Sequence, residues 1–89
     1  MHAVVIRVSI KDEENAQKAL TEEVVPRVSH APGFVAGHWT KSDDGTNGMS
    51  LLVFESEDAA RTASERIGAN VPEAVTLESI EVREIVAKA

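Results

Sequence analysis

The sequence predicts an α+β fold with a four-stranded antiparallel sheet and two helices on one of its faces. Two segments, 12–29 and 56–68, carry apolar residues at helical spacing. Four short segments are rich in β-branched or alternating residues, which is typical of strands: 4–10, 34–41, 49–55 and 75–86. The order is therefore strand, helix, strand, strand, helix, strand.

Length and composition predict one small domain, residues 1–89. Only 3% of the residues are aromatic, so the core must be built from Val, Ile, Leu and Ala. A chain of this size buries only roughly 60–65% of its unfolded surface, and association with a second copy would help to stabilise it. There is no Cys, which excludes disulfides, thiolate metal ligands and a Cys nucleophile.

Charge and hydropathy limit the possible partners. The net charge of -6 argues against a nucleic-acid partner, because that affinity depends largely on Lys and Arg at the phosphates. The N-terminus does not match a signal peptide, since it has no basic leader and Arg7 interrupts its apolar run. No segment approaches the ~20 apolar residues of a membrane span. We therefore expect a cytoplasmic protein with no membrane partner.

The first helix contains an unexpected proline. Asp12 is a suitable N-cap, and the apolar spacing continues from Ala16 to Val28. Pro26 falls within this pattern, where proline removes a hydrogen bond and clashes with the preceding turn. Because Val28 keeps the apolar register, we expect a kink near Pro26 and a further turn that ends at Ser29.

The second strand follows a turn predicted at Pro32-Gly33. Strict alternation along 34–41 would place Phe34 on the same face as His38 and Trp39 on the opposite face. His38 and Trp39 therefore cannot easily act on one ligand.

The third strand follows a hairpin loop that contains Asp-Gly and Asn-Gly pairs. Four consecutive apolar residues, 51–54, predict that this strand is buried on both faces.

The second helix has Ser56 as its predicted N-cap, a stripe of small Ala residues and a stop at Gly68. In the last strand, 75–86, the apolar residues change parity, which a bulge or a change of pairing partner would explain. The complete βαββαβ order is the ferredoxin-like arrangement.

The helix-free face of the sheet is predicted to pair with a second copy of the chain. It would carry Val5, either Trp39 or Phe34, and half of the apolar run 51–54. A face this apolar is rarely left exposed on a small domain. Two sheets packed face to face about a two-fold axis would bury it in a homodimer.

Two motifs resemble those of the dimeric α+β barrel superfamily. They are Pro32-Gly33-Phe34 after a helix, and the segment 52–60, Leu-Val-Phe-Glu-Ser-Glu-Asp-Ala-Ala, which opens the second helix. The chain is most similar to the small antibiotic-biosynthesis-monooxygenase-type domains. The resemblance implies a dimeric α+β barrel and activities that include cofactor-independent oxygenation and haem degradation.

Several residues are candidates for chemistry. His38 and Trp39 are the catalytic candidates, because a His titrates near neutral pH and a Trp can wall an apolar pocket. Ligand-binding candidates are Arg7, Phe34, Trp39 and Phe54, although Arg7 has an alternative role in a salt bridge to Glu81 on the last strand. The three His residues do not have metal-ligand spacing, so we expect no metal, and we expect no cofactor.

The chain departs from the family's haem-degrading pattern, because its first strand has no Asn and its second helix has no His. It also lacks the Tyr of the quinone-forming oxygenases, although Trp39, Arg7 and Asn15 are present. Two hypotheses follow. The first is a dimeric protein that binds a small apolar or aromatic molecule and has cofactor-independent monooxygenase activity. The alternative is a non-catalytic module for ligand binding or dimerisation, toward which the scarcity of aromatic and clustered polar residues leans.

Overall fold

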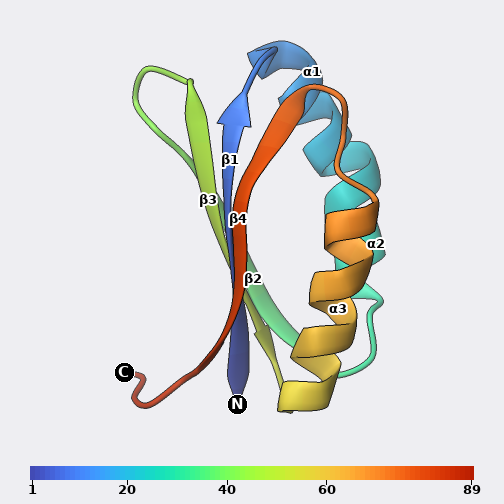
Figure 1. The fold of residues 1–89 in the computed structure, drawn as a ribbon, viewed down its shortest axis with the longest axis vertical. Helices are drawn as coiled ribbons and strands as arrows, with labels where there is room; N and C mark the ends of the chain where they lie inside the picture. The colour runs from blue at the N-terminus through green and yellow to red at the C-terminus, as the bar shows by residue number, and fades with distance from the viewer.

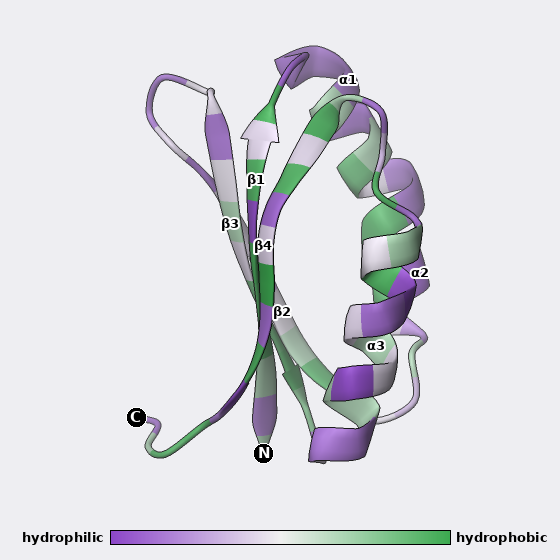
Figure 2. Cartoon of the chain, in the orientation of Figure 1, coloured by the Kyte–Doolittle hydropathy of each residue, from purple (hydrophilic) through white to green (hydrophobic).

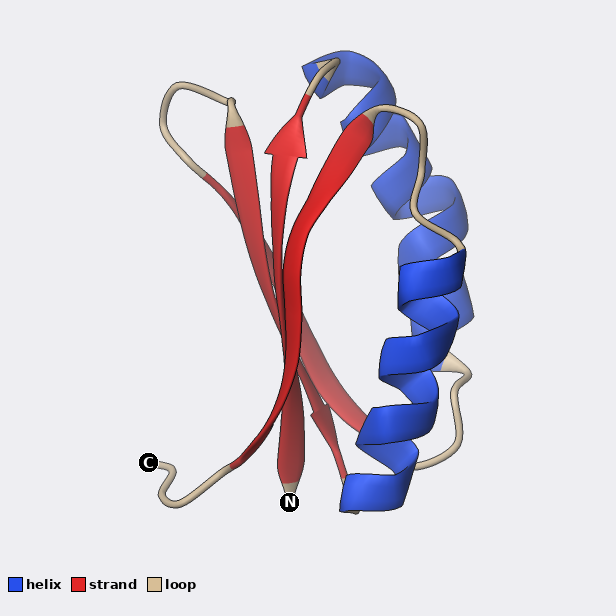
Figure 3. Ribbon diagram, viewed as in Figure 1, coloured by secondary structure: helices blue, strands red, loops and turns tan.

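The computed structural model describes all residues from 1 to 89 and confirms the ferredoxin-like α+β fold (Figure 1). One antiparallel sheet has the strand order β2-β3-β1-β4, and the helices lie together on one of its faces (Figure 3). Both termini lie at the same end of the sheet. The elements are β1 (His2–Ile10), α1 (Glu13–Ala19), the π-helical turn η1 (Leu20–Val24), α2 (Val25–Ser29), β2 (Phe34–Lys41), β3 (Asn47–Phe54), α3 (Glu57–Ala69) and β4 (Val75–Glu84).

The core lies between the sheet and the helices. Val4, Leu52 and Phe54 are completely buried, and Ala60 and Ala63 of α3 pack against them. The small alanines let α3 approach the sheet closely, as their spacing predicts. Complete burial of a Leu or Phe side chain contributes ~1.5–3 kcal/mol, so this cluster is a main source of stability.

The helix that contains Pro26 continues through a π-helical turn. The N–H of Val25 donates to the carbonyl of Leu20, five residues earlier, and Pro26 then falls in the first turn of α2. Proline has no N–H to donate, so the regular i→i−4 hydrogen-bond pattern is interrupted at Pro26, and the wider π-helical turn lies at this interruption. Val28 is buried, as its register predicts.

The predicted helix ends are only partly confirmed. Asp12 and Ser56 cap α1 and α3, and acidic residues in both first turns appear as hydrophilic segments in Figure 2. Gly68, predicted to stop the second helix, lies inside α3 and has no positive φ. The helix ends instead at Asn70, whose side-chain Nδ2 donates to the carbonyl of Arg66 at 2.8 Å.

Two bulges change which residues face the helices. Between β1 and β4, Arg7 pairs with Ser79 and Val8 with Leu77, which leaves Glu78 as an extra residue and confirms the predicted bulge. Between β2 and β3, Phe34 pairs with Phe54 and Ala36 with Val53, so Val35 has no partner. This second bulge was not predicted.

The prediction for the helix-free face of the sheet, called the open face below, was partly wrong because of the bulge at Val35. Strict alternation separates Phe34 from Trp39, but the extra residue turns Phe34 to the helix side, where both aromatic residues pack against the core. The open face carries neither of them. It carries Val5, Leu51 and Met49, and the last two are 42% and 47% exposed, so β3 is covered on only one face within a single chain.

No helix is both long enough and apolar enough to cross a membrane.

Candidate ligand pocket

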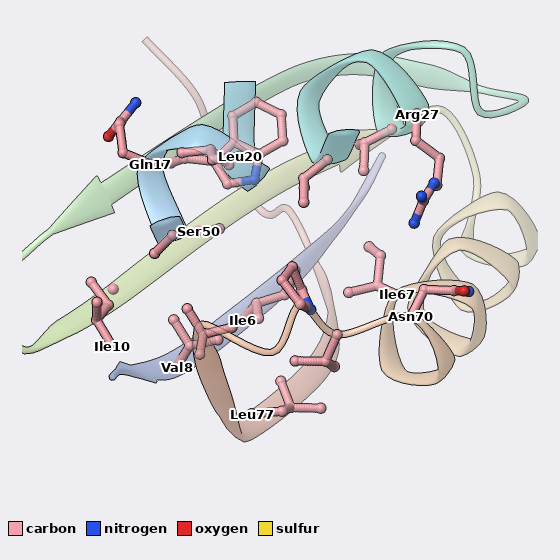
Figure 4. A pocket seen from close by; sticks show the side chains of 18 of the residues that line it. Ile6, Val8, Ile10, Gln17, Leu20, Arg27, Ser50, Ile67, Asn70 and Leu77 are labelled. Atoms are coloured by element: carbon pink, nitrogen blue, oxygen red, sulfur yellow. The ribbon is translucent and has the colours of Figure 1, made fainter. Parts of the chain in front are cut away.

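A cavity of about 470 Å³ lies between the sheet and the helices, near the end where β1 finishes and β4 begins. Figure 4 shows Ile6, Val8 and Leu77 on the strand side and Leu20 on the helix side. Exposed side chains such as Arg66 also line it, so the cavity reaches the surface. Apolar walls with a few polar groups are typical of small-molecule sites.

The cavity results from a gradient of side-chain size along β3. The residues of this strand that face the helices are Gly48, Ser50, Leu52 and Phe54, in that order. Leu52 and Phe54 fill the space beneath α3 at one end. Gly48 and Ser50 are too small to fill it at the other end, and both line the cavity. This gradient can be read from the sequence once it is known which alternate residues of β3 face the helices.

Trp39 forms part of the cavity wall at this open end. It pairs with Ser50 in the sheet register, and both side chains face the cavity. The Trp39 indole N–H and the Ser50 hydroxyl make no hydrogen bond within the chain, so both are free to bind a ligand that carries an acceptor. The site therefore offers an apolar surface with two hydrogen-bonding groups beside it.

The structure brings only Trp39, among the predicted site residues, to the cavity. His38 lies on the opposite face of β2 and pairs with Leu51, which confirms that His38 and Trp39 point apart. Phe54 packs edge-to-face against Phe34 with their ring centroids 5.8 Å apart, and neither ring lines the cavity.

Arg7 lies on the open face, between Met49 and Ser79 in register. The salt bridge to Glu81 is not formed, because the Glu81 carboxylate is bound by Arg83 at 2.7 Å. Arg7 instead borders a second hollow of about 480 Å³, which is lined mostly by polar residues.

Sequence reasoning missed most of the polar lining, which includes Arg27, His30, Arg66 and Asn70. These residues lie on helix surfaces, where charged residues are common and give no special signal. The His30 ring is already engaged, with its Nδ1 2.6 Å from the carbonyl oxygen of Pro26. No group of three or more His, Cys, Asp or Glu residues is placed to hold a metal ion.

Comparison with known proteins identifies the fold class. The chain has the fold of dimeric ferredoxin-like proteins and of antibiotic-biosynthesis-monooxygenase-type domains. No protein-family model matches it, and no curated protein matches it by sequence.

Three solved structures illustrate the similarity. A dimeric ferredoxin-like protein from an uncultured marine organism is 13% identical, with a TM-score of 0.68 and coverage of 100% of this chain and 98% of that one. A monooxygenase from the gene ActVA-Orf6 of Streptomyces coelicolor, in complex with nanaomycin D, is 18% identical, with a TM-score of 0.58 and coverage of 99% and 92%. The heme-degrader MhuD of Mycobacterium tuberculosis, with two hemes bound, is 22% identical, with a TM-score of 0.56 and coverage of 97% and 98%.

Proposed function

We propose that this protein is a homodimer whose cavity binds a small apolar or aromatic molecule and oxygenates it without a cofactor. The observation that carries the proposal is the apolar cavity of about 470 Å³ with Trp39 in its wall. The similarity in fold to the Streptomyces monooxygenase with its bound ligand supports it. The absence of His from α3 favours oxygenation over haem degradation, given the pattern of the haem-degrading relatives.

A cofactor-independent reaction requires an electron-rich substrate, because O₂ must take its electrons from the substrate itself. An activated CH₂ group takes one oxygen atom and becomes a carbonyl, while the second oxygen leaves with the two hydrogens as water. The protein contributes position and shielding from bulk water. We assign ligand contact to Trp39, whose ring can stack on a planar substrate.

The catalytic assignment of His38 stays a separate part of the proposal. Because this side chain faces the open side of the sheet, it can act only on a molecule that reaches that face. The variant His38→Gln tests the assignment. Because His38 does not line the cavity, unchanged turnover in this variant would contradict the catalytic assignment, and lost turnover with the dimer mass retained would support it.

The homodimer is proposed to form through the open sheet face. Met49 and Leu51 of β3 are large apolar residues about half exposed in the single chain, and Val5 lies beside Leu51 in register. The solved dimeric ferredoxin-like protein of similar fold supports this assembly. Light scattering across a dilution series should give about twice the chain mass of 9.6 kDa, whereas a monomer at every concentration would contradict it.

Oxygen consumption with anthrone tests the activity. Anthrone has a CH₂ group between two aromatic rings, and its oxygenation would give anthraquinone and water. We expect consumption above the spontaneous rate, and we expect Trp39→Ala to reduce it to that rate. Trp39 is the only Trp, and the chain has no Tyr, so its fluorescence reports binding independently. Binding without turnover would favour the non-catalytic ligand-binding module.

A further inference from the structure

Two arginines that line the cavity have no acidic partner. Four fully charged side chains contribute to the lining: Glu13, Arg27, Lys41 and Arg66. Lys41 Nζ lies 2.5 Å from Glu13 Oε1, so these two neutralise each other. Arg27 and Arg66 form no ion pair with any carboxylate of the chain. The lining therefore has an excess of two positive charges in a protein with a net charge of -6.

Local sequence explains why the two arginines are free. Arg61 on α3 has Glu57 four residues before it and forms the i,i+4 ion pair typical of helices. Glu23 stands at the same spacing before Arg27, but the π-helical turn between them changes the helical phase, and no pair forms. Arg66 has no carboxylate three or four residues away in either direction.

The two arginines belong to the helices that flank the cavity, Arg27 to α2 and Arg66 to α3. Figure 4 shows the Arg27 guanidinium at the same end of the cavity as Ile67 and Asn70, away from Ser50 and Ile10. Arg66 directly precedes Ile67 on α3 and also lines the cavity. The cavity thus has a cationic end, followed by apolar walls such as Ile67 and Leu77.

We infer that the ligand is an amphipathic carboxylate, whose acid group binds Arg27 and Arg66 and whose apolar body lies along the cavity. A guanidinium binds a carboxylate through two parallel, charge-assisted hydrogen bonds, which are stronger than neutral ones. The negative charge of the whole chain does not attract an anion, so such binding needs this local pair. The inference rests on the proposed function and specifies the class of molecule the cavity takes.

Isothermal titration calorimetry at about pH 7, where a carboxylic acid is ionised, tests the inference with two matched pairs of probes. The pairs are decanoate with decan-1-ol, and 2-naphthoate with 2-naphthylmethanol. We expect one of the acids to bind about tenfold or more tightly than its alcohol, the effect of one hydrogen bond to a charged group. Arg27→Gln and Arg66→Gln should each remove about that factor from the acid and leave the alcohol unchanged.

Arg61→Gln is the matched control, because Arg61 is an exposed arginine of α3 that does not line the cavity. Far-UV circular dichroism and solution mass show whether each variant keeps the fold. The carboxylate assignment would be overturned if acid and alcohol bound equally well. It would also be overturned if Arg61→Gln lost as much affinity for the acid as the two cavity variants. Either result would leave the cavity as a binding site. If no probe of either pair binds, the ligand pocket itself is contradicted.

Discussion

The ring of Trp39 lies over Gly37, two residues before it on the same face of β2. A Cβ at Gly37 would come within 2.8 Å of Cη2 of Trp39 and 3.1 Å of Cδ2 of Leu52. Real Cβ atoms do not approach other atoms that closely, so only glycine leaves room for the indole in this position. The cavity wall therefore depends on a residue that has no side chain of its own.

Replacement of Gly37 by Ala should displace the indole. Overpacking of this kind costs ~1–3 kcal/mol, so we expect the free energy of unfolding in urea to fall by about that amount. The emission maximum of Trp39 should shift at the same time. Gly68→Ala is the control, because nothing lies within 4 Å of a Cβ there, and in the helix it should stabilise the protein by ~0.5–1 kcal/mol. Unchanged emission in Gly37→Ala would contradict the contact.

A charge on the open sheet face should prevent dimerisation. Leu51 is 42% exposed in the single chain and pairs with Val5 and His38, at the middle of the proposed interface. Leu51→Glu would bury a carboxylate from each copy at this interface, so light scattering should give the mass of one chain. Thr62→Glu adds the same charge on the exposed side of α3 and should leave the dimer intact. A dimer that persists in Leu51→Glu would place the interface elsewhere.

Phe54 should contribute to stability and not to ligand affinity. It is completely buried and packs edge-to-face against Phe34, outside the cavity. We expect Phe54→Leu to lower the free energy of unfolding by about 1–2 kcal/mol, from imperfect packing and the lost aromatic pair. The affinity for a cavity ligand, measured by calorimetry, should not change. A selective loss of affinity would show that Phe54 contributes to ligand binding, as the sequence analysis predicts.

The β2–β3 loop should respond to acid below the usual range of an Asp. Hydrogen bonds from the hydroxyls of Ser42 and Thr46 and from the Thr46 N–H hold the carboxylate of Asp44 and lower its pKa to about 2. The pKa of Asp44 is lower in the folded chain than its unfolded value of 3.8, so the ionised carboxylate stabilises the folded state. This stabilisation is complete above pH 3.8 and is lost as the pH falls through 2.

The amide proton of Thr46, followed by NMR, should titrate with a midpoint near pH 2, provided that the chain remains folded. The variant Asp44→Asn keeps the side-chain shape and should abolish the titration. A midpoint near the ordinary Asp value would show that the hydrogen bonds do not form in solution.

The fold was predictable because its signals are local. Ser56 is a favourable cap wherever it occurs before a helix, and β-branched alternation favours a strand without help from the rest of the chain. Even the parity change in 75–86 correctly indicated a bulge. The prediction that Gly68 ends the second helix was wrong, because glycine is permitted inside a helix and no local feature distinguishes that position from a helix end.

The site was less predictable because it depends on which residues face each other across the sheet. The bulge at Val35 moved Phe34 to the helix side, and no turn residue or parity change marks it in the sequence. The size gradient from Gly48 to Phe54 becomes a cavity only when those residues lie beneath the helices. Arg27 and Arg66 are 39 positions apart and come to one cavity only through the packing of α2 and α3.

The sequence and the tertiary structure therefore determine different features of this protein. Element order, helix caps, the turn at Gly33 and the apolar open face follow from the chain, because propensity and periodicity act over a few neighbouring residues. The cavity, its cationic end and the position of Phe34 on the same side of the sheet as Trp39 required the folded structure. Register and bulges decide them, and a shift of one residue reverses the face of every side chain that follows.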